Sequence, residues 1–161
     1  MSRDAKESVK PGVPAPDFSL PNQLGETIRL KQLRGTPVVL YFYPKDDTPG
    51  CTKEACGFRD SYAKVTKAGA EVFGVSLDAA DSHTKFIDKY ALPFSLLSDC
   101  DAVVSKAYGV YKLKNMYGRT YWGIERSTFV IDKAGLITAS FRKVKVDGHV
   151  QEVLAALRDQ P

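Results

Sequence analysis

Cys51 is the residue of this chain that is best placed to do chemistry. It follows the turn-forming residues Thr48-Pro49-Gly50, and the pattern after it is helical, so we expect it in the first turn of a helix. That turn carries free backbone N–H groups and the positive end of the helix dipole. Such a position lowers the pKa of a thiol from about 8.5 toward neutrality, and the thiolate is the nucleophilic form. The sequence therefore predicts a reactive cysteine, with a buried packing cysteine as the weaker alternative.

A second cysteine, Cys56, lies five residues further along the same predicted helix. On an intact helix this spacing separates the two Cα atoms by roughly 8.6 Å and the side chains by about 140° around the axis. A disulfide requires Cα atoms within about 7 Å and converging Cβ atoms. A Cys51–Cys56 disulfide would therefore require the first helical turns to unwind. The spacing suits a thiol that is oxidised first and joined to its partner second, unlike a C-x-x-C pair.

The residues around both cysteines resemble the signature of a known family. Pro44, Thr48 and Cys51 match the P-x-x-x-T-x-x-C pattern of the peroxiredoxins. The longer run from Tyr43 to Cys56 is similar to the Q-type subgroup, also called bacterioferritin-comigratory proteins. The combined pattern is far more specific than any of its parts. Further matches extend the resemblance over nearly the whole chain, at Pro16-Asp17-Phe18, Ser98-Asp99 and 126–132.

The resemblance implies a role for five residues in peroxide reduction. Cys51 would attack the peroxide and become a sulfenic acid. The hydroxyl of Thr48 would hydrogen-bond the thiolate and the peroxide, besides any role at the helix start. The backbone N–H groups of Cys51 and Gly50 would donate to the substrate oxygen. Pro44 would shield the sulfur from water, and Arg126 would stabilise the thiolate and the transition state.

Arg126 is 75 residues away from Cys51, so only the resemblance places it near the sulfur. On its own it would be explained by a surface salt bridge with Glu125. Arg119 is the competing candidate, in a segment that looks mobile. We favour Arg126, because the family carries an arginine just before this strand.

The two other cysteines receive different interpretations. Cys56 is expected to resolve the Cys51 sulfenic acid as an intramolecular disulfide, with a core cysteine as the alternative. Cys100 follows Ser98-Asp99, where related chains often carry another residue, and we interpret it as a partly buried bystander. Glu54, in the first turn of the predicted helix, is interpreted as a charge favoured by the helix dipole rather than as a catalytic acid.

Metal and nucleotide chemistry find little support in the sequence. Zinc takes four ligands at set spacings, and one C-x4-C pair with a distant cysteine and two histidines offers no such set. His83 and His149 are interpreted as solvated helix residues. The phosphate-binding motifs G-x-x-x-x-G-K-S/T and G-x-G-x-x-G are both missing. We therefore expect no metal and no cofactor.

An α/β fold must position these residues. Val38–Tyr43 is a continuous apolar run typical of a strand buried on both faces, and Pro44 ends it. Strand-like and helix-like segments alternate through the middle of the chain, with hairpins near both ends, which indicates a mixed central β-sheet flanked by helices. The thioredoxin-like fold has this order. The other predicted elements are hairpins at 18–30 and 128–141, strands at 71–76 and 94–97, and helices from the turn to about 67, then at 82–90, 101–108 and 149–158.

Two segments are expected to lack regular structure. Residues 1–16 contain three prolines and mixed charge, which predicts a flexible N-terminal arm before a single domain at 17–161. Residues 111–124, rich in Tyr, Gly and Lys, are expected to form a loop. Its aromatic side chains either cover a sheet edge or form an apolar collar over Cys51 that admits organic peroxides. The sequence favours neither interpretation.

Composition narrows the classes of protein to consider. With 161 residues, 43% hydrophobic and 26% charged, the chain fits one globular domain. The net charge of +4 is spread without an aromatic stacking motif, so we expect no nucleic-acid partner. No apolar run is long enough for a membrane span, and the start lacks the apolar core of a secretory signal. Three cysteines do not make a disulfide framework, so we expect the cytoplasm, or the plastid stroma if a transit peptide had been removed.

These inferences converge on an enzyme. We expect a monomeric thiol peroxidase that reduces hydrogen peroxide and organic hydroperoxides, uses Cys51 and Cys56 within one chain, and is recycled by thioredoxin or a similar dithiol reductant. One alternative is a single-cysteine peroxidase resolved by an external thiol, with Cys56 idle. The other is a redox-sensing switch that uses the same unwinding to bind or release a partner.

Overall fold

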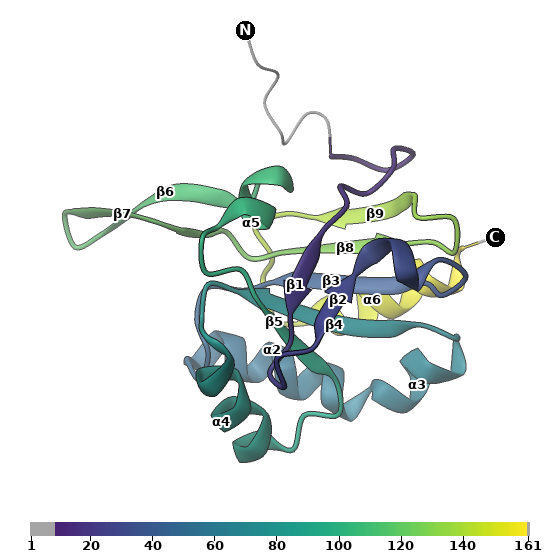
Figure 1. The fold of residues 1–161 in the computed structure, drawn as a ribbon, viewed down its shortest axis with the longest axis horizontal. Helices are drawn as coiled ribbons and strands as arrows, with labels where there is room; N and C mark the ends of the chain where they lie inside the picture. Colours follow the sequence, from purple (N-terminus) through teal and green to yellow (C-terminus); the bar gives the residue numbers. More distant parts are fainter. Residues whose placement is uncertain (1–8, 161) are drawn as a thin grey trace, which may run out of the picture.

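A five-stranded mixed sheet forms the centre of the computed structural model, which describes residues 9–160 (Figure 1). The strand order is β5-β4-β3-β8-β9. Strands β3 (Val38–Phe42), β4 (Glu71–Ser76) and β5 (Ser95–Ser98) are parallel. Strand β8 (Ser127–Ile131) is antiparallel to β3 and to β9 (Ile137–Phe141). The predicted mixed sheet is therefore confirmed.

Strand β3 is the centre of the sheet and is buried on both faces, as its apolar run predicts. Its side chains alternate between two hydrophobic clusters. Val38, Leu40 and Phe42 enter one cluster, with side chains of the N-terminal hairpin. Val39 and Tyr41 enter the other, beneath the helices. Because β3 is packed on both faces, the loop of residues 44–48 that follows it starts from a rigid edge of the sheet.

Four helices cover the face of the sheet that holds Val39. They are α2 (Pro49–Asp60), α3 (Tyr62–Lys67), α4 (Ala80–Tyr90) and α6 (His149–Arg158). The single helix predicted to about Lys67 is instead divided at Ser61, whose φ and ψ of −103° and 7° lie outside the helical range. Serine favours helix ends over helix interiors, because its hydroxyl competes for backbone hydrogen bonds.

The N-terminal hairpin is confirmed on the opposite face. Strands β1 (Ser19–Pro21) and β2 (Thr27–Arg29) pair antiparallel, and a 3-10 turn, η1 (Leu30–Leu33), follows them. The short helix α5 (Val103–Ala107) lies within the predicted 101–108.

Residues 9–16 run beside β9, with backbone hydrogen bonds such as Gly12 N–H to the Ile137 carbonyl (2.8 Å). The rest of the expected arm lies outside the described residues, and the domain division at residue 16 stays a prediction.

The prediction of a loop at 111–124 is wrong. Strands β6 (Tyr111–Met116) and β7 (Arg119–Ile124) form a regular hairpin that projects from the body of the molecule (Figure 1). Its turn residues, Tyr117 and Gly118, both have positive φ, +53° and +78°, as a tight two-residue hairpin turn requires. The alternation of apolar and polar residues in β6 was the sequence signal for a strand. The turn was harder to predict, because tyrosine is uncommon at a left-handed turn position. Within residues 9–160, no helix is long and apolar enough to cross a membrane.

Candidate active site

Cys51 lies in the first turn of α2, as predicted, and its side chain is buried with 1% exposure. Thr48 is the N-cap residue by position, and Pro49 occupies the first helical position, where its missing N–H costs nothing. The loop of residues 44–48 joins β3 directly to this helix. Strand, loop and helix therefore bring the sulfur to the carboxyl edge of the parallel strands.

Arg126 reaches the sulfur from the junction of β7 and β8. Its Nη2 donates to Cys51 Sγ over 3.4 Å, and its Nη1 donates to Glu54 Oε1 over 2.8 Å. Burial opposes the guanidinium charge, but Glu54 and Cys51 outweigh it, so the pKa of Arg126 is raised. A permanent positive charge thus points at the sulfur, where it favours the thiolate. Arg119, the competing candidate, lies exposed near the tip of the hairpin, opposite Met116.

Glu54 is fully buried beside Arg126, where we had expected only a charge favoured by the helix dipole. Burial raises the pKa of this carboxyl to about 7, although Arg126 acts in the opposite direction. Its second oxygen, Oε2, has no hydrogen-bond partner within residues 9–160. His149 Nε2 lies 3.9 Å from that oxygen. Glu54 therefore holds Arg126 in place from a dry position.

His149 is not the solvated residue that we expected, because its side chain is buried between α6 and β8. Its Nδ1 is 2.7 Å from Glu152 Oε1, and its Nε2 is 2.7 Å from the Thr128 hydroxyl. Burial lowers the pKa of His149, so a neutral ring donates to Glu152 and accepts from Thr128. Its spacing of four from Val153, on the apolar side of α6, was the signal that could have revealed this burial.

The three other residues predicted at the site lie in or just before the first turn of α2. A Cβ at Gly50 would lie 3.0 Å from Arg126 Nη2, so a larger residue there would displace the guanidinium. The Thr48 hydroxyl donates to the Lys45 carbonyl over 2.9 Å and makes no capping hydrogen bond. No hydrogen bond joins Thr48 to Cys51 within the described part of the chain. Pro44 is half-buried directly after β3 and Tyr43.

Lys114, on β6, adds a second cation that sequence reasoning missed. Burial and the charge of Arg126 lower the pKa of Lys114, while Cys51 and Glu125 act in the opposite direction. Lys114 is paired with Tyr121 across the hairpin. The hairpin therefore contributes charge to the surroundings of the sulfur, which a predicted loop could not have indicated.

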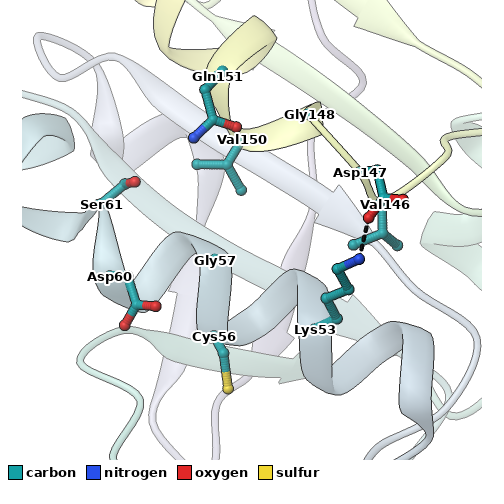
Figure 2. Close-up of a pocket in the computed structure, with 10 residues that line it drawn as sticks. All are labelled: Lys53, Cys56, Gly57, Asp60, Ser61, Val146, Asp147, Gly148, Val150 and Gln151. Carbon is teal, nitrogen blue, oxygen red and sulfur yellow. Dashed lines mark hydrogen bonds and ion pairs between the residues drawn. The ribbon is translucent and has the colours of Figure 1, made fainter.

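The three cysteines are all free, and they occupy different environments. Cys51 and Cys56 both lie within the continuous helix α2, so the five-residue spacing of a wound helix separates them. Cys56 is half-buried and borders a groove of about 430 Å³ between α2 and the start of α6. Figure 2 shows its side chain pointing away from Val150, while Lys53 reaches Asp147 across the groove. Cys100 is exposed after β5, rather than partly buried, with its sulfur 3.8 Å from the Asp78 carbonyl oxygen.

Comparison with known proteins gives consistent similarities. The model of the AhpC/TSA family matches residues 11–140. A putative peroxiredoxin bcp of Coxiella burnetii is 55% identical over 93% of this chain and 99% of its own length. Peroxiredoxin Bcp of Bacillus subtilis is 49% identical over 94% of this chain and 97% of its own length. A solved structure of Xanthomonas campestris peroxiredoxin Q is 43% identical, with a TM-score of 0.86 over 92% of this chain and 96% of that chain.

Proposed function

This chain belongs to the AhpC/TSA family as a peroxiredoxin of the Bcp/Q type, and from this premise we propose that Cys51 is its peroxide-reducing thiol. The predicted resemblance and the predicted thioredoxin-like fold are both confirmed. A peroxiredoxin is a thiol-dependent peroxidase. A related Xanthomonas protein has been solved in complexes that concern alkyl peroxide reduction. This relative supports organic hydroperoxides, besides hydrogen peroxide, as substrates of this chain.

In the first step, the Cys51 thiolate attacks one oxygen of the peroxide. An S–O bond forms, the O–O bond breaks, and the other oxygen leaves as hydroxide or alkoxide and takes up a proton. Cys51 becomes a sulfenic acid. The forked contact of Arg126 with Cys51 and Glu54 is the observation that carries this proposal, because it aims a fixed positive charge at the charge that develops.

Pre-organised donors would complete the site around the peroxide. The N–H groups of Gly50 and Cys51 lie in the first helical turn, where no intrahelical acceptor faces them. The Thr48 hydroxyl donates to the Lys45 carbonyl in this structure, and on substrate binding it would rotate to donate to the peroxide oxygen. Pro44 would limit the access of water to the sulfur.

In the second step, the Cys56 thiolate attacks the sulfenic sulfur of Cys51. An S–S bond forms, the S–O bond breaks, and the hydroxyl group leaves as hydroxide, which takes up a proton from solvent to become water. Because the two residues share a wound helix, α2 must open first. Thioredoxin, or another dithiol, would then reduce the exposed disulfide. The monomeric state and the cytoplasmic location stay predictions.

Peptide mapping of the non-reduced protein after peroxide treatment tests this proposal directly. We expect a Cys51–Cys56 link and none to Cys100. Cys51→Ser should abolish peroxide consumption, whereas Cys56→Ser should consume one equivalent and then fail to cycle with thioredoxin. Cys100→Ser is the matched control and should cycle normally.

Turnover retained in Cys51→Ser would contradict the assignment of Cys51 as the nucleophile, and cycling lost in Cys100→Ser alone would move the resolving role to Cys100. A single oxidation without turnover in the unaltered protein would favour the redox switch.

A further inference from the structure

A second buried polar cluster adjoins the loop that precedes Cys51, and the proposed reaction does not use it. Its centre is His83, in the first turn of α4, which is fully buried rather than solvated as expected. His83 contacts Asp46, which belongs to the loop of residues 44–48. Both side chains lie beneath the surface, with 0% and 4% side-chain exposure. Burying polar, ionisable side chains is costly unless they are paired, so we expect this pair to have a role in the loop that leads to Cys51.

Both ring nitrogens of His83 have partners that define where its protons lie. Nε2 is 3.0 Å from the Leu97 carbonyl oxygen, and a carbonyl can only accept, so Nε2 carries a proton. Nδ1 is 2.7 Å from Asp46 Oδ2, and a second proton must lie between these two atoms. His83 therefore joins the loop to strand β5 by two opposed hydrogen bonds. Few side chains could make both contacts from one position.

Asp46 is bound from several directions. The Tyr43 hydroxyl donates to Oδ1 over 2.5 Å, and the Ser82 hydroxyl donates to Oδ2 over 2.9 Å. The backbone N–H of Asp46 donates to Asp78 Oδ2 over 2.8 Å. Together with His83, the Tyr43 and Ser82 hydroxyls therefore give the Asp46 carboxylate three hydrogen-bond partners in a nearly dry site, where such bonds are stronger than in water.

The next loop residue is attached to the same helix. Asp47 accepts from Lys89 Nζ and from the Tyr90 hydroxyl, each over 2.9 Å. Its φ of +56° lies in the left-handed region, which is uncommon for a residue other than glycine. Asp46 and Asp47 therefore attach the loop to both ends of α4, and the second attachment holds a backbone angle that a free loop would rarely adopt.

The contacts of α2 lie on the other side of the turn and involve different partners. Cys51 and Glu54 are held by Arg126, and Lys53 by the exposed Asp147. Within the described residues, no side-chain hydrogen bond links the Asp46–His83 pair to α2 itself. The loop and the helix can therefore part at Pro49 without breaking the pair.

We propose that His83 is a positioning residue which, through Asp46, keeps the loop of residues 44–48 attached to α4 and β5 while α2 unwinds and rewinds. The inference rests on the proposed function. In the wound state the pair places Pro44 and Thr48 around the sulfur for the peroxide step. In the unwound state it limits the opening to the helix, so that α2 rewinds onto a loop that has not moved.

The test separates the two chemical steps. Rapid-quench alkylation and mass spectrometry follow sulfenic acid and disulfide formation in His83→Ala and Asp46→Ala. We expect the peroxide step to slow at least about tenfold in both, because a displacement of about 1 Å at a reacting site can cost about a hundredfold. Disulfide formation, which needs an open helix, should stay within about twofold of the unaltered protein, since it uses no contact of the pair.

Two further variants exclude a merely structural effect. Asp46→Asn retains an N–H for His83 Nδ1 and an oxygen for Tyr43, so it should keep most of the peroxide rate that Asp46→Ala loses. Val65→Ala removes buried apolar volume in α3, far along the chain from the loop, and should lower the melting temperature without separating the two steps. Should His83→Ala not fold, the Asp46→Ala and Asp46→Asn comparison makes the same test.

Several results would overturn the inference. Equal slowing of both steps in His83→Ala, or rates like those of Val65→Ala, would show a structural role only. Loss of the peroxide step in Asp46→Asn to the level of Asp46→Ala would refute the bridging geometry. If the unaltered protein fails to form a sulfenic acid at Cys51, the proposed function itself fails, and that outcome is visible before any variant is compared.

Discussion

Arg126 contacts two acceptors at once, and this forked geometry links the sulfur to a buried carboxylate. One Nη atom faces Cys51 and the other faces Glu54. Burying a carboxylate is costly unless it is paired, and Glu54 is paired on one oxygen only. The arrangement therefore uses Glu54 to orient the guanidinium and the guanidinium to stabilise the sulfur.

Arg126→Lys should slow the reaction of the reduced protein with peroxide at least about tenfold. A lysine keeps the charge but offers one ammonium, which cannot reach both acceptors in the same geometry. Stopped-flow measurement of the first step checks this. Arg119→Lys, at the exposed hairpin position, is the matched control and should stay within about twofold. A normal rate in Arg126→Lys would show that the charge alone suffices.

Gly50→Ala should separate activity from stability. Alanine is favoured over glycine in a helix by about 1 kcal/mol, so the melting temperature should not fall. The new Cβ, however, would lie 3.0 Å from Arg126 Nη2, and the flexible guanidinium would move away from the sulfur. We expect the peroxide step to slow at least about tenfold, as one displaced charge-assisted contact implies.

Gly57→Ala is the control for this change. It lies in the same helix, but its Cβ would approach Val150 rather than Arg126. Its peroxide rate should therefore stay near that of the unaltered protein, whatever its stability. Equal loss of rate in both variants would mean that helix packing, and not the arginine, limits the reaction.

At the scale of elements, α2 has two incompatible tasks. In its wound form α2 holds Cys51 against Arg126, whereas the proposed disulfide between Cys51 and Cys56 would require the helix to open. The loop before it is attached to α4, and the helix is attached to Arg126 and α6. On this proposal, the opening would be confined to α2, between a loop and neighbouring elements that stay in place.

Amide hydrogen exchange of the oxidised protein should show this opening. We expect residues 51–58 to lose protection on disulfide formation, because the backbone hydrogen bonds of the first turns must break. Strand β3, buried in the sheet, should keep its protection. In Cys56→Ser, peroxide treatment should leave the helix protected. Unchanged exchange over 51–58 in the oxidised protein would refute the coupling between the disulfide and unwinding.

At the scale of the whole molecule, the buried carboxyl of Glu54 makes stability depend on pH. Its pKa in the folded protein is about 7, raised by burial from an ordinary 4.5. The protonated form therefore stabilises the fold, fully below about pH 4.5, and this contribution is lost as the pH rises through about 7. Opening of α2 releases the same carboxyl to water, so higher pH also favours the unwound helix.

Glu54→Gln should remove this dependence. The free energy of unfolding of the variant, minus that of the unaltered protein, should rise between pH 4.5 and 8, by up to about 3 kcal/mol for a shift of this size. Denaturant unfolding of the reduced proteins at several pH values measures it. Glu71→Gln, at an exposed position, should show no such trend. A difference that is flat with pH would mean that Arg126 keeps Glu54 ionised throughout.

The local features of this protein could be predicted because neighbouring residues determine them. An apolar run makes β3, a proline ends it, and a Thr-Pro-Gly turn starts the helix at Cys51. The spacing of Cys51 and Cys56 follows from the geometry of any helix. The resemblance, which covers most of the chain, supplied the choice of Arg126 over Arg119.

The tertiary structure alone decided which atoms the buried polar residues contact. Glu54, His83 and His149 have ordinary helical positions in the sequence, and each is buried only because a distant segment covers it. The hairpin of β6 and β7 brings Lys114 toward the site from a segment that looked like a loop. A local pattern can place a residue on an apolar helix face, as the spacing of His149 does, but the atoms that it contacts there belong to segments too far along the chain for that pattern to specify.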